Sequence, residues 1–291
     1  MPCDDTTQAE AWSLILRELP ASAGIDATLH DTAERYGIRL LADRSWVSER
    51  PVSAAARALL DIFVPLIARG STLVIAQLGQ SLDGRIATAN GVSHYITGEA
   101  ARAHLHRLRA IVDAVVIGVG TLNADDPQLT VRHVEGRNPV RVLLDPDGRA
   151  QPGSRVFHDG LAPVIHVTAS RDGAGASRTP AGVELLVLPR HPVHGFDPAT
   201  LLAALAARGL GRVLVEGGGL TVSRFLQAGV LHRLHIMVAP MLIGSGRPGV
   251  CLPPVTSLDG ALRPVCRVFA CGDDSLFDLA LDGAPASGGR V

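Results

Sequence analysis

From Val213 the chain reads Val-Leu-Val-Glu-Gly-Gly-Gly-Leu-Thr-Val, and this stretch of residues 213–222 decides the fold class. Three apolar residues predict a short buried strand, Glu216 and three glycines form the turn, and a helix is predicted over residues 219–228. Backbone N–H groups at a helix start that follows glycines attract anions, a pyrophosphate above all. The alternative is a tight turn without a ligand, although three successive glycines carry a large entropic cost on folding.

The same rhythm of strand, loop and helix runs through most of the chain from residue 71. Strands are predicted at residues 72–78, 114–118, 140–144, 163–167, 183–188, 213–215 and 234–238, and further helices at 100–110 and 198–208. Strands that alternate with helices predict an α/β layered domain, here placed at residues 71–282.

Three other segments are expected to differ from this domain. Residues 1–70 are predicted as a small helical extension of unknown role, with helices at 9–19, 26–36 and 51–68. Residues 171–180 read as a surface loop, and residues 283–291 as a disordered tail, because both are rich in small residues.

Composition narrows the class of protein. The chain has 291 residues, is 47% hydrophobic and carries 27 Lys+Arg against 28 Asp+Glu, a formal net charge of −1. This balance offers no overall field for nucleic acid or an anionic membrane. No export signal or membrane span is found, and the cysteines (Cys3, Cys251, Cys266 and Cys271) have no metal-site or disulfide spacing. We therefore expect a cytoplasmic protein with reduced thiols and no metal.

Two more turns could bring backbone close to a ligand. Residues 77–87 read Gln-Leu-Gly-Gln-Ser-Leu-Asp-Gly-Arg-Ile-Ala, a strand end that runs into a turn. Residues 115–122 read Val-Val-Ile-Gly-Val-Gly-Thr-Leu, and glycines at the carboxyl end of a strand admit a nucleotide. Neither signal is specific alone, since the second lacks the third glycine of a dinucleotide fingerprint.

Taken in order, the motifs resemble a known family. They are SLDGRIA (81–87), GVSHYIT (91–97) followed by Arg109, GVGTLNADDPQLTVR (118–132), NPVRVLLD (138–145), VEGGGL (215–220) and APMLIG (239–244). This series resembles the reductase domain that the bifunctional riboflavin biosynthesis enzyme carries after its deaminase domain. The resemblance runs from about Leu73 to about Asp282, which is most of the chain.

The resemblance implies a fold and a reaction. The fold would be dihydrofolate reductase-like, an α/β central mixed sheet flanked by helices. The reaction would be hydride transfer from NADPH to C1′ of a ribosylaminopyrimidine 5′-phosphate in its ring-opened imine form, giving the ribityl product. The family is typically homodimeric, and the strands at residues 234–238 and 265–270 could supply the interface.

The resemblance also implies site residues. Cofactor contacts would come from Gly79, Tyr95, Gly118, Thr121, Asp125, Gly218, Gly219, Leu220, Thr221, Val222, Ser223 and Arg224. Substrate contacts would come from Ser93, Arg109, Leu129, Arg132 and Glu216. The forked donors of the two arginines suit a phosphate dianion, and we expect them to converge on it. Asp83 and Glu216 are the candidate proton donors.

Two departures from the family pattern stand out. Bacterial bifunctional members usually have Lys where this chain has Gln77, and Trp where it has Tyr95. No zinc-binding His-x-Glu with a Pro-Cys-x-x-Cys occurs before residue 70, so no deaminase activity is expected. Two alternatives stay open: an NADPH-dependent reductase of a pterin or other heterocycle, similar to those acting on dihydrofolate or dihydromethanopterin, and a non-catalytic NADPH-binding relative.

Overall fold

A computed structural model describes residues 6–18, 37–41, 43–169, 179–193 and 195–282. The chain divides into two compact units at Leu73, close to the boundary expected from the sequence. The helix predicted at residues 26–36, most of the loop at 171–180 and the tail at 283–291 lie outside the described residues.

The first unit contains strands as well as helices. Its elements are α1 (Gln8–Glu18), β1 (Ile38–Leu40), β2 (Trp46–Ser48) and α3 (Ala54–Ile67). The antiparallel pair β1–β2 corrects the expectation of a purely helical extension. Each strand has only three residues, too few for a period-two pattern to show, and they form because Ile38 completes a core with Leu14 and Leu60 of the helices.

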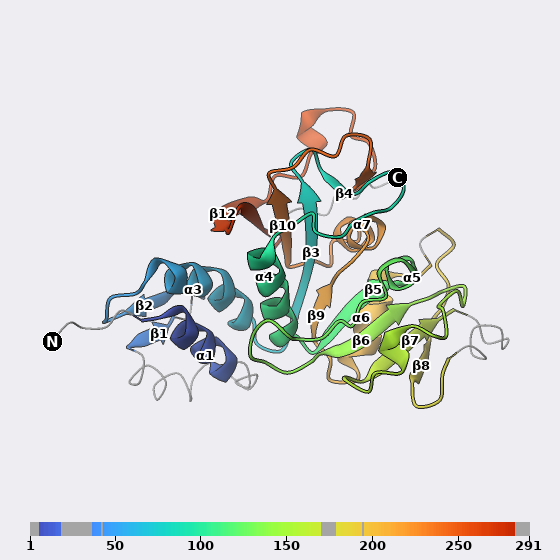
Figure 1. Cartoon of the computed structure of the whole chain (residues 1–291), viewed down its shortest axis with the longest axis horizontal. Coiled ribbons are helices and arrows are strands. Elements are labelled where there is room, and N and C mark those ends of the chain that lie inside the picture. The colour runs from blue at the N-terminus through green and yellow to red at the C-terminus, as the bar shows by residue number, and fades with distance from the viewer. Residues whose placement is uncertain (1–5, 19–36, 42, 170–178, 194, 283–291) are drawn as a thin grey trace. The chain divides into compact units, whose positions relative to one another are not determined.

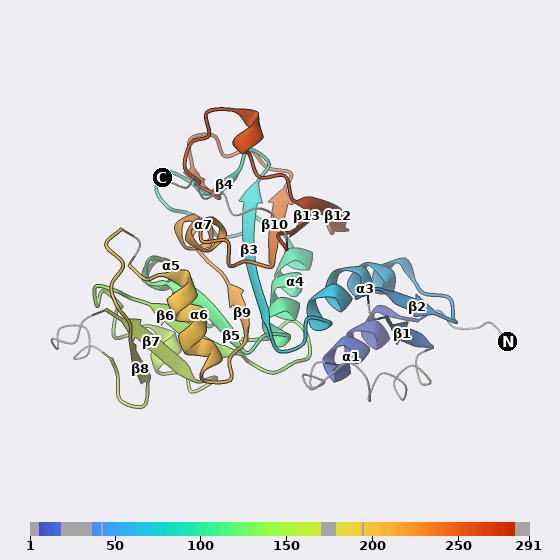
Figure 2. The same cartoon turned by 180° about the vertical axis from the view of Figure 1, so that it is seen from behind.

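The second unit is built on a nine-stranded sheet within the described residues, in the order β12-β13-β10-β3-β9-β5-β6-β7-β8 (Figures 1 and 2). The strands are β3 (Leu73–Ser81), β5 (Ala114–Gly118), β6 (Val140–Leu144), β7 (Val164–Thr168), β8 (Glu184–Val187), β9 (Arg212–Val215), β10 (Arg233–Ala239), β12 (Val265–Cys271) and β13 (Asp274–Ala280). The pairs β10–β3, β9–β5, β5–β6, β6–β7 and β7–β8 are parallel. At the other edge β13 runs antiparallel to both β10 and β12.

Four helices accompany this sheet in the described part of the unit: α4 (Glu99–Ala110), α5 (Val119–Asp125), α6 (Pro198–Ala206) and α7 (Gly219–Gln227). The short strands β4 (Arg85–Ala87) and β11 (Arg247–Pro248) pair with each other beside it. The expected mixed sheet flanked by helices is confirmed. Two elements were not predicted from the sequence. They are α5, which begins Val-Gly-Thr, and β13, which buries two aspartates.

The two faces of the sheet differ in chemistry. On one face, strand residues such as Val116 and Val215 form an apolar core with Leu201 of α6 and Phe225 of α7. The other face lies under α4, which Figure 1 shows in front of β3 and β10. There the alternate strand positions include buried polar residues, Gln77 on β3 and His235 on β10 among them. This polar face therefore holds the groups that could act on a ligand.

None of the helices in the described ranges is both long enough and apolar enough to cross a membrane.

The turn from β9 into α7 has no room for a side chain at Gly219. A Cβ atom added to Gly219 would lie 2.1 Å from the carbonyl oxygen of Gly249, well inside van der Waals contact. Backbone atoms cannot retreat as a flexible side chain can, so glycine is required at this helix start.

We predict that Gly219→Ala lowers the free energy of unfolding by about 1–3 kcal/mol through overpacking. Gly153→Ala is the control, because a Cβ there meets nothing within 4 Å and its φ is not positive. Urea unfolding of both variants tests this, and equal stability would contradict the steric reading of the turn.

Candidate active site at the carboxyl ends of the parallel strands

Two of the segments singled out in the sequence meet at neighbouring strand ends. β5 runs into α5 and β9 into α7, and the N–H of Gly218 donates to Oγ1 of Thr121 over 2.9 Å. A Cβ on Gly217 would lie 2.7 Å from that same Oγ1, and one on Gly118 would lie 2.9 Å from Oγ1 of Thr221. The glycines thus let the two turns approach each other, as at the nucleotide-binding edge of an open parallel sheet.

Two of the backbone N–H groups at the start of α7 remain available to bind an anion. The N–H groups of Thr221 and Val222 both donate to the carbonyl of Gly218. The N–H groups of Gly219 and Leu220 have no acceptor among the described residues, so they remain available to an anion.

Two residues expected in the cofactor set have structural side chains instead. Val222 is fully buried in the apolar core, and Ser223 is buried with its Oγ accepting the N–H of Cys251 over 2.8 Å. Helical periodicity explains this, since both residues point from α7 into the fold. The side-chain contribution is thereby restricted to Leu220, Thr221 and Arg224, which are exposed or half-buried.

Arg109 is committed to an ion pair inside the protein. Its Nε and Nη2 donate to the two carboxylate oxygens of Glu216, each over 2.7 Å, and its Nη1 donates to the carbonyl of Thr130 over 3.0 Å. Arg109 and Glu216 are each only 6% exposed. The donor fork of Arg109 is thus occupied by Glu216 and Thr130 in the ligand-free chain, and its predicted convergence with Arg132 on a phosphate stays a prediction.

Arg132 is different, because the described part of the chain gives it no carboxylate partner. Its Nη1 donates to Oε1 of Gln128 and Oγ1 of Thr130, over 2.6 and 2.9 Å. Burial lowers the pKa of this guanidinium, and the positive charges of Arg109 and Arg155 lower it further. An exposed cation in a positive neighbourhood is suited to binding an anion.

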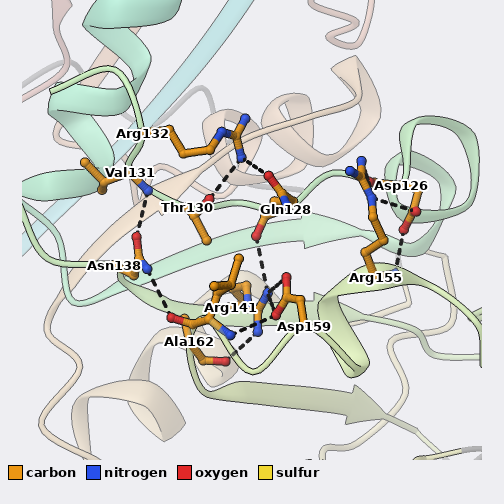
Figure 3. A network of polar contacts seen from close by, with 11 residues as sticks. Asp126, Gln128, Thr130, Val131, Arg132, Asn138, Arg141, Arg155, Asp159 and Ala162 are labelled. Atoms are coloured by element: carbon orange, nitrogen blue, oxygen red, sulfur yellow. Dashed lines mark hydrogen bonds and ion pairs between the residues drawn. The ribbon is translucent and has the colours of Figure 1, made fainter.

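The loop that carries Arg132 is held from its other side. Figure 3 shows the Arg132 guanidinium across the loop from a cluster in which Arg141 binds both oxygens of Asp159, each over 2.8 Å. Arg141 also donates to the carbonyl of Gln128, and Asn138 accepts the N–H of Val131. This scaffold fixes the loop while leaving Arg132 on its free side.

Backbone strain gathers in the same loop. Asp126 and Leu129 have φ of 40° and 56°, the left-handed region that side chains other than glycine seldom adopt. Leu129 is 1% exposed, so its side chain packs in the interior. Any contact that Leu129 makes with a substrate must come from its backbone.

Asp83 does not have the environment of a proton donor. Its carboxylate accepts the Ser81 hydroxyl and the N–H groups of Ile243 and Gly244, over 2.5, 3.1 and 2.6 Å. These hydrogen bonds, that from Ser81 first, lower its pKa to about 2. Asp83 thus stays ionised at neutral pH and ties two turns together, which corrects its assignment as a general acid.

The other predicted residues lie at exposed or half-buried positions around these turns. Ser93 donates to Asp125 over 3.3 Å, which joins a predicted substrate contact to a predicted cofactor contact. Tyr95 has φ of 65° and is 82% exposed, and its ring lies 5.8 Å from the Arg102 guanidinium. A Cβ on Gly79 would lie 3.0 Å from Cγ2 of Thr97, so glycine allows this loop to pass close to β3.

Sequence reasoning missed His106. This residue is 3% exposed, and its Nδ1 accepts the backbone N–H of Arg132 over 2.8 Å. Burial first, then the nearby charge of Arg109, lowers its pKa to about 3, which keeps the acceptor nitrogen unprotonated. Its spacing of three from Arg109 on a predicted helix was the one signal that could have identified it.

Residues 72–264 match the RibD C-terminal domain. The chain is 34% identical over 217 residues to 2,5-diamino-6-ribosylamino-4(3H)-pyrimidinone 5′-phosphate reductase of Methanothermobacter thermautotrophicus, covering 72% of this chain and 98% of the relative. It is 33% identical over 192 residues to riboflavin biosynthesis protein RibD of Aquifex aeolicus, covering 66% and 52%.

Solved structures agree with this assignment. Acinetobacter baumannii RibD superposes with a TM-score of 0.61 at 31% identity, covering 78% of this chain and 62% of that one. A Thermotoga maritima diaminohydroxyphosphoribosylaminopyrimidine deaminase/5-amino-6-(5-phosphoribosylamino)uracil reductase gives 0.60 at 29%, covering 77% and 61%. The chain spans about half the length of curated RibD relatives, 52% and 54% in two cases. The resemblance drawn from the motifs and the expected fold are confirmed.

We predict that His106 makes stability fall on acidification. The folded protein keeps His106 neutral down to about pH 3, whereas the unfolded chain takes up a proton near the ordinary pKa of 6.5. The unfolded state then binds more protons below about pH 6.5, so the free energy of unfolding decreases from pH 7 to pH 5.

Thermal unfolding between pH 5 and 7.5 measures this effect. His106→Asn keeps an acceptor near Nδ1 but cannot titrate, so its Tm should depend less on pH than the wild-type Tm. His94→Asn changes an exposed histidine and should leave the slope unaltered. Equal slopes in wild type and His106→Asn would contradict the prediction.

Proposed function

Because the chain belongs to the family of RibD C-terminal domains, we propose that it is an NADPH-dependent reductase in riboflavin biosynthesis. Its substrate would be a ribosylaminopyrimidine 5′-phosphate such as 5-amino-6-(5-phosphoribosylamino)uracil. The observation that carries the proposal is Arg132, an exposed arginine that has no carboxylate partner in the described residues and lies on a loop held by His106. Arg132 would bind the substrate phosphate.

The residues at the two glycine turns fit a nicotinamide dinucleotide. The N–H groups of Gly219 and Leu220 would bind a cofactor phosphate at the start of α7, and Thr121 and Thr221 line the approach from β5. Glu216 is the acid at this strand end, and it is occupied by Arg109. No acid at this turn is thus left to accept a ribose 2′-hydroxyl, which favours NADPH over NADH.

When bound, NADPH would supply the hydride that adds to C1′ of the imine. Reduction of the C=N bond leaves the nitrogen in need of one proton. Asp83 stays ionised, and Glu216 accepts from Arg109 through both oxygens, so we propose that water delivers this proton. The Arg109–Glu216 pair would present a fixed carboxylate edge that orients the substrate.

Arg132 also separates this function from the alternatives. A pterin has no phosphate ester, and a non-catalytic relative needs no substrate phosphate site. Neither alternative calls for a phosphate-binding guanidinium on this loop. We also propose a cytoplasmic location for the reaction, and we expect no deaminase activity from these residues.

We predict that Arg132→Ala lowers kcat/KM for the phosphorylated substrate by about ten- to a hundredfold, the value of a charge-assisted hydrogen bond. Loss of nicotinamide absorbance measures the rate, and the Kd for NADPH should be unchanged. Arg149→Ala, a change in an arginine whose side chain is 64% exposed, is the control and should keep full activity.

The dephosphorylated substrate completes this test. With it, wild type and Arg132→Ala should differ little, because the phosphate interaction is absent from both. If wild type handles both substrates equally well, Arg132 binds something else. Arg109→Ala is not a suitable probe, since an unpaired buried Glu216 would cost about 3–5 kcal/mol of stability.

We further propose a homodimer that uses the edge strand β12. Of the two strands expected to form the interface, β10 is enclosed between β3 and β13, so it offers no free edge. β12 lies at the edge of the sheet, with Val265 and Val268 75% and 58% exposed. An apolar sheet edge of this kind invites pairing with a second copy.

Val268→Lys should shift the protein from dimer to monomer in light scattering at micromolar concentration. Val255→Lys changes an exposed valine outside the sheet and should leave the mass unchanged. A wild-type protein that is monomeric under these conditions would contradict the proposal.

A further inference from the structure

Asp274 is a buried acid that holds the start of α4. It is the first residue of β13 and is 4% exposed, and its Oδ2 accepts the backbone N–H of Gly98 over 2.7 Å. Gly98 is the N-cap residue of α4 and has no side chain of its own with which to cap the helix. The two residues are 176 positions apart in the sequence, so the tertiary fold supplies the hydrogen bond.

The environment of Asp274 differs from that of the other buried acid on β13. Asp278 is 1% exposed and is balanced by two cations, since it accepts from Arg233 over 2.9 Å and from Arg267 over 2.8 Å. Asp274 forms no such ion pair among the described residues, and the start of α4 is what its carboxylate faces. A buried carboxylate is unfavourable unless it is bonded, and the positive end of a helix dipole stabilises it. The burial of Asp274 therefore depends on the position of α4.

The turn between β12 and β13 is shaped to approach α4. Gly272 has φ of 65°, and a Cβ atom added to it would lie 3.1 Å from Cβ of Ala100 in the first turn of α4. Only two residues join the register partners Cys271 and Asp274, so the turn has little freedom of its own. The hairpin thus presents the carboxylate to the helix at a fixed place, which lies outside the residues that match the family model.

The start of α4 directly follows a loop that belongs to the candidate site. Residues 93–97 lead into the helix, and they include the predicted ligand contacts Ser93 and Tyr95. The far end of α4 is held independently, through the ion pair between Arg109 and Glu216. Loss of the hydrogen bond from β13 would therefore release the loop and the first turn while the far end of the helix stays in place.

We propose that Asp274 is a positioning residue that fixes the loop of residues 93–97 through the backbone of Gly98. The inference rests on the proposed function and adds a residue that would touch neither substrate nor cofactor. A loop that is ordered before the ligand arrives costs less entropy to bind against. The loss of Asp274 should thus weaken substrate binding more than it slows the chemical step.

The variants Asp274→Ala and Asp274→Asn test this role. Asp274→Ala removes the acceptor, and we expect the KM for the ribosylaminopyrimidine to rise about three- to tenfold while kcat changes about twofold or less. Asp274→Asn keeps an oxygen that can accept the N–H of Gly98, so it should restore most of the wild-type KM. In the ligand-free protein, backbone amides of residues 93–101 should exchange with deuterium faster in Asp274→Ala than in wild type.

The control is Asp273→Ala, which removes the same charge from an exposed side chain in the same turn and should alter none of these measurements. If Asp274→Ala lowers Tm but leaves KM and the exchange at residues 93–101 unchanged, the role is purely structural and the proposal is overturned. An Asp274→Asn variant as impaired as Asp274→Ala would overturn it too, because the hydrogen bond would not be the cause. If wild type reduces no ribosylaminopyrimidine, the proposed function fails, and the exchange measurement still decides whether Asp274 fixes the loop.

Discussion

The buried ion pair between Arg109 and Glu216 is the interaction on which the active-site half of the fold depends. It joins α4 to the turn after β9, and both partners are almost fully removed from water. Either charge alone would be strongly unfavourable in that environment, so α4 must dock where the two meet. The docking in turn sets the positions of His106 and, through it, of the backbone at Arg132.

The two faces of the sheet have different roles. The face under α6 and α7 is apolar and supplies the main hydrophobic core. The face under α4 carries Gln77, His235 and other buried polar groups, most of which are paired within the protein. Polar groups that are paired hold the framework, whereas the Arg132 guanidinium has hydrogen bonds to Gln128 and Thr130 but no carboxylate partner among the described residues, and so remains suited to an anionic ligand.

The glycines of the candidate site serve packing as well as ligand approach. Gly217 and Gly118 let the β5 and β9 turns touch, and Gly219 fits against the carbonyl of Gly249. The two interpretations of the glycine run therefore do not compete. The steric need brings the turns together, and the free N–H groups at the start of α7 are a consequence of that geometry.

The sequence by itself determined the alternation of strands and helices, the family, and the segments that meet at the site. These follow from local periodicity, from glycine turns and from ordered motifs, all of which a linear reading contains. Only the tertiary structure decided the partners of each side chain. Arg109 and Arg132 look alike in sequence, but one faces Glu216, 107 positions away, and the other has no acid in the described chain. Such pairings depend on how distant elements pack, and so do the ionisation of Asp83 and the burial of Gln77.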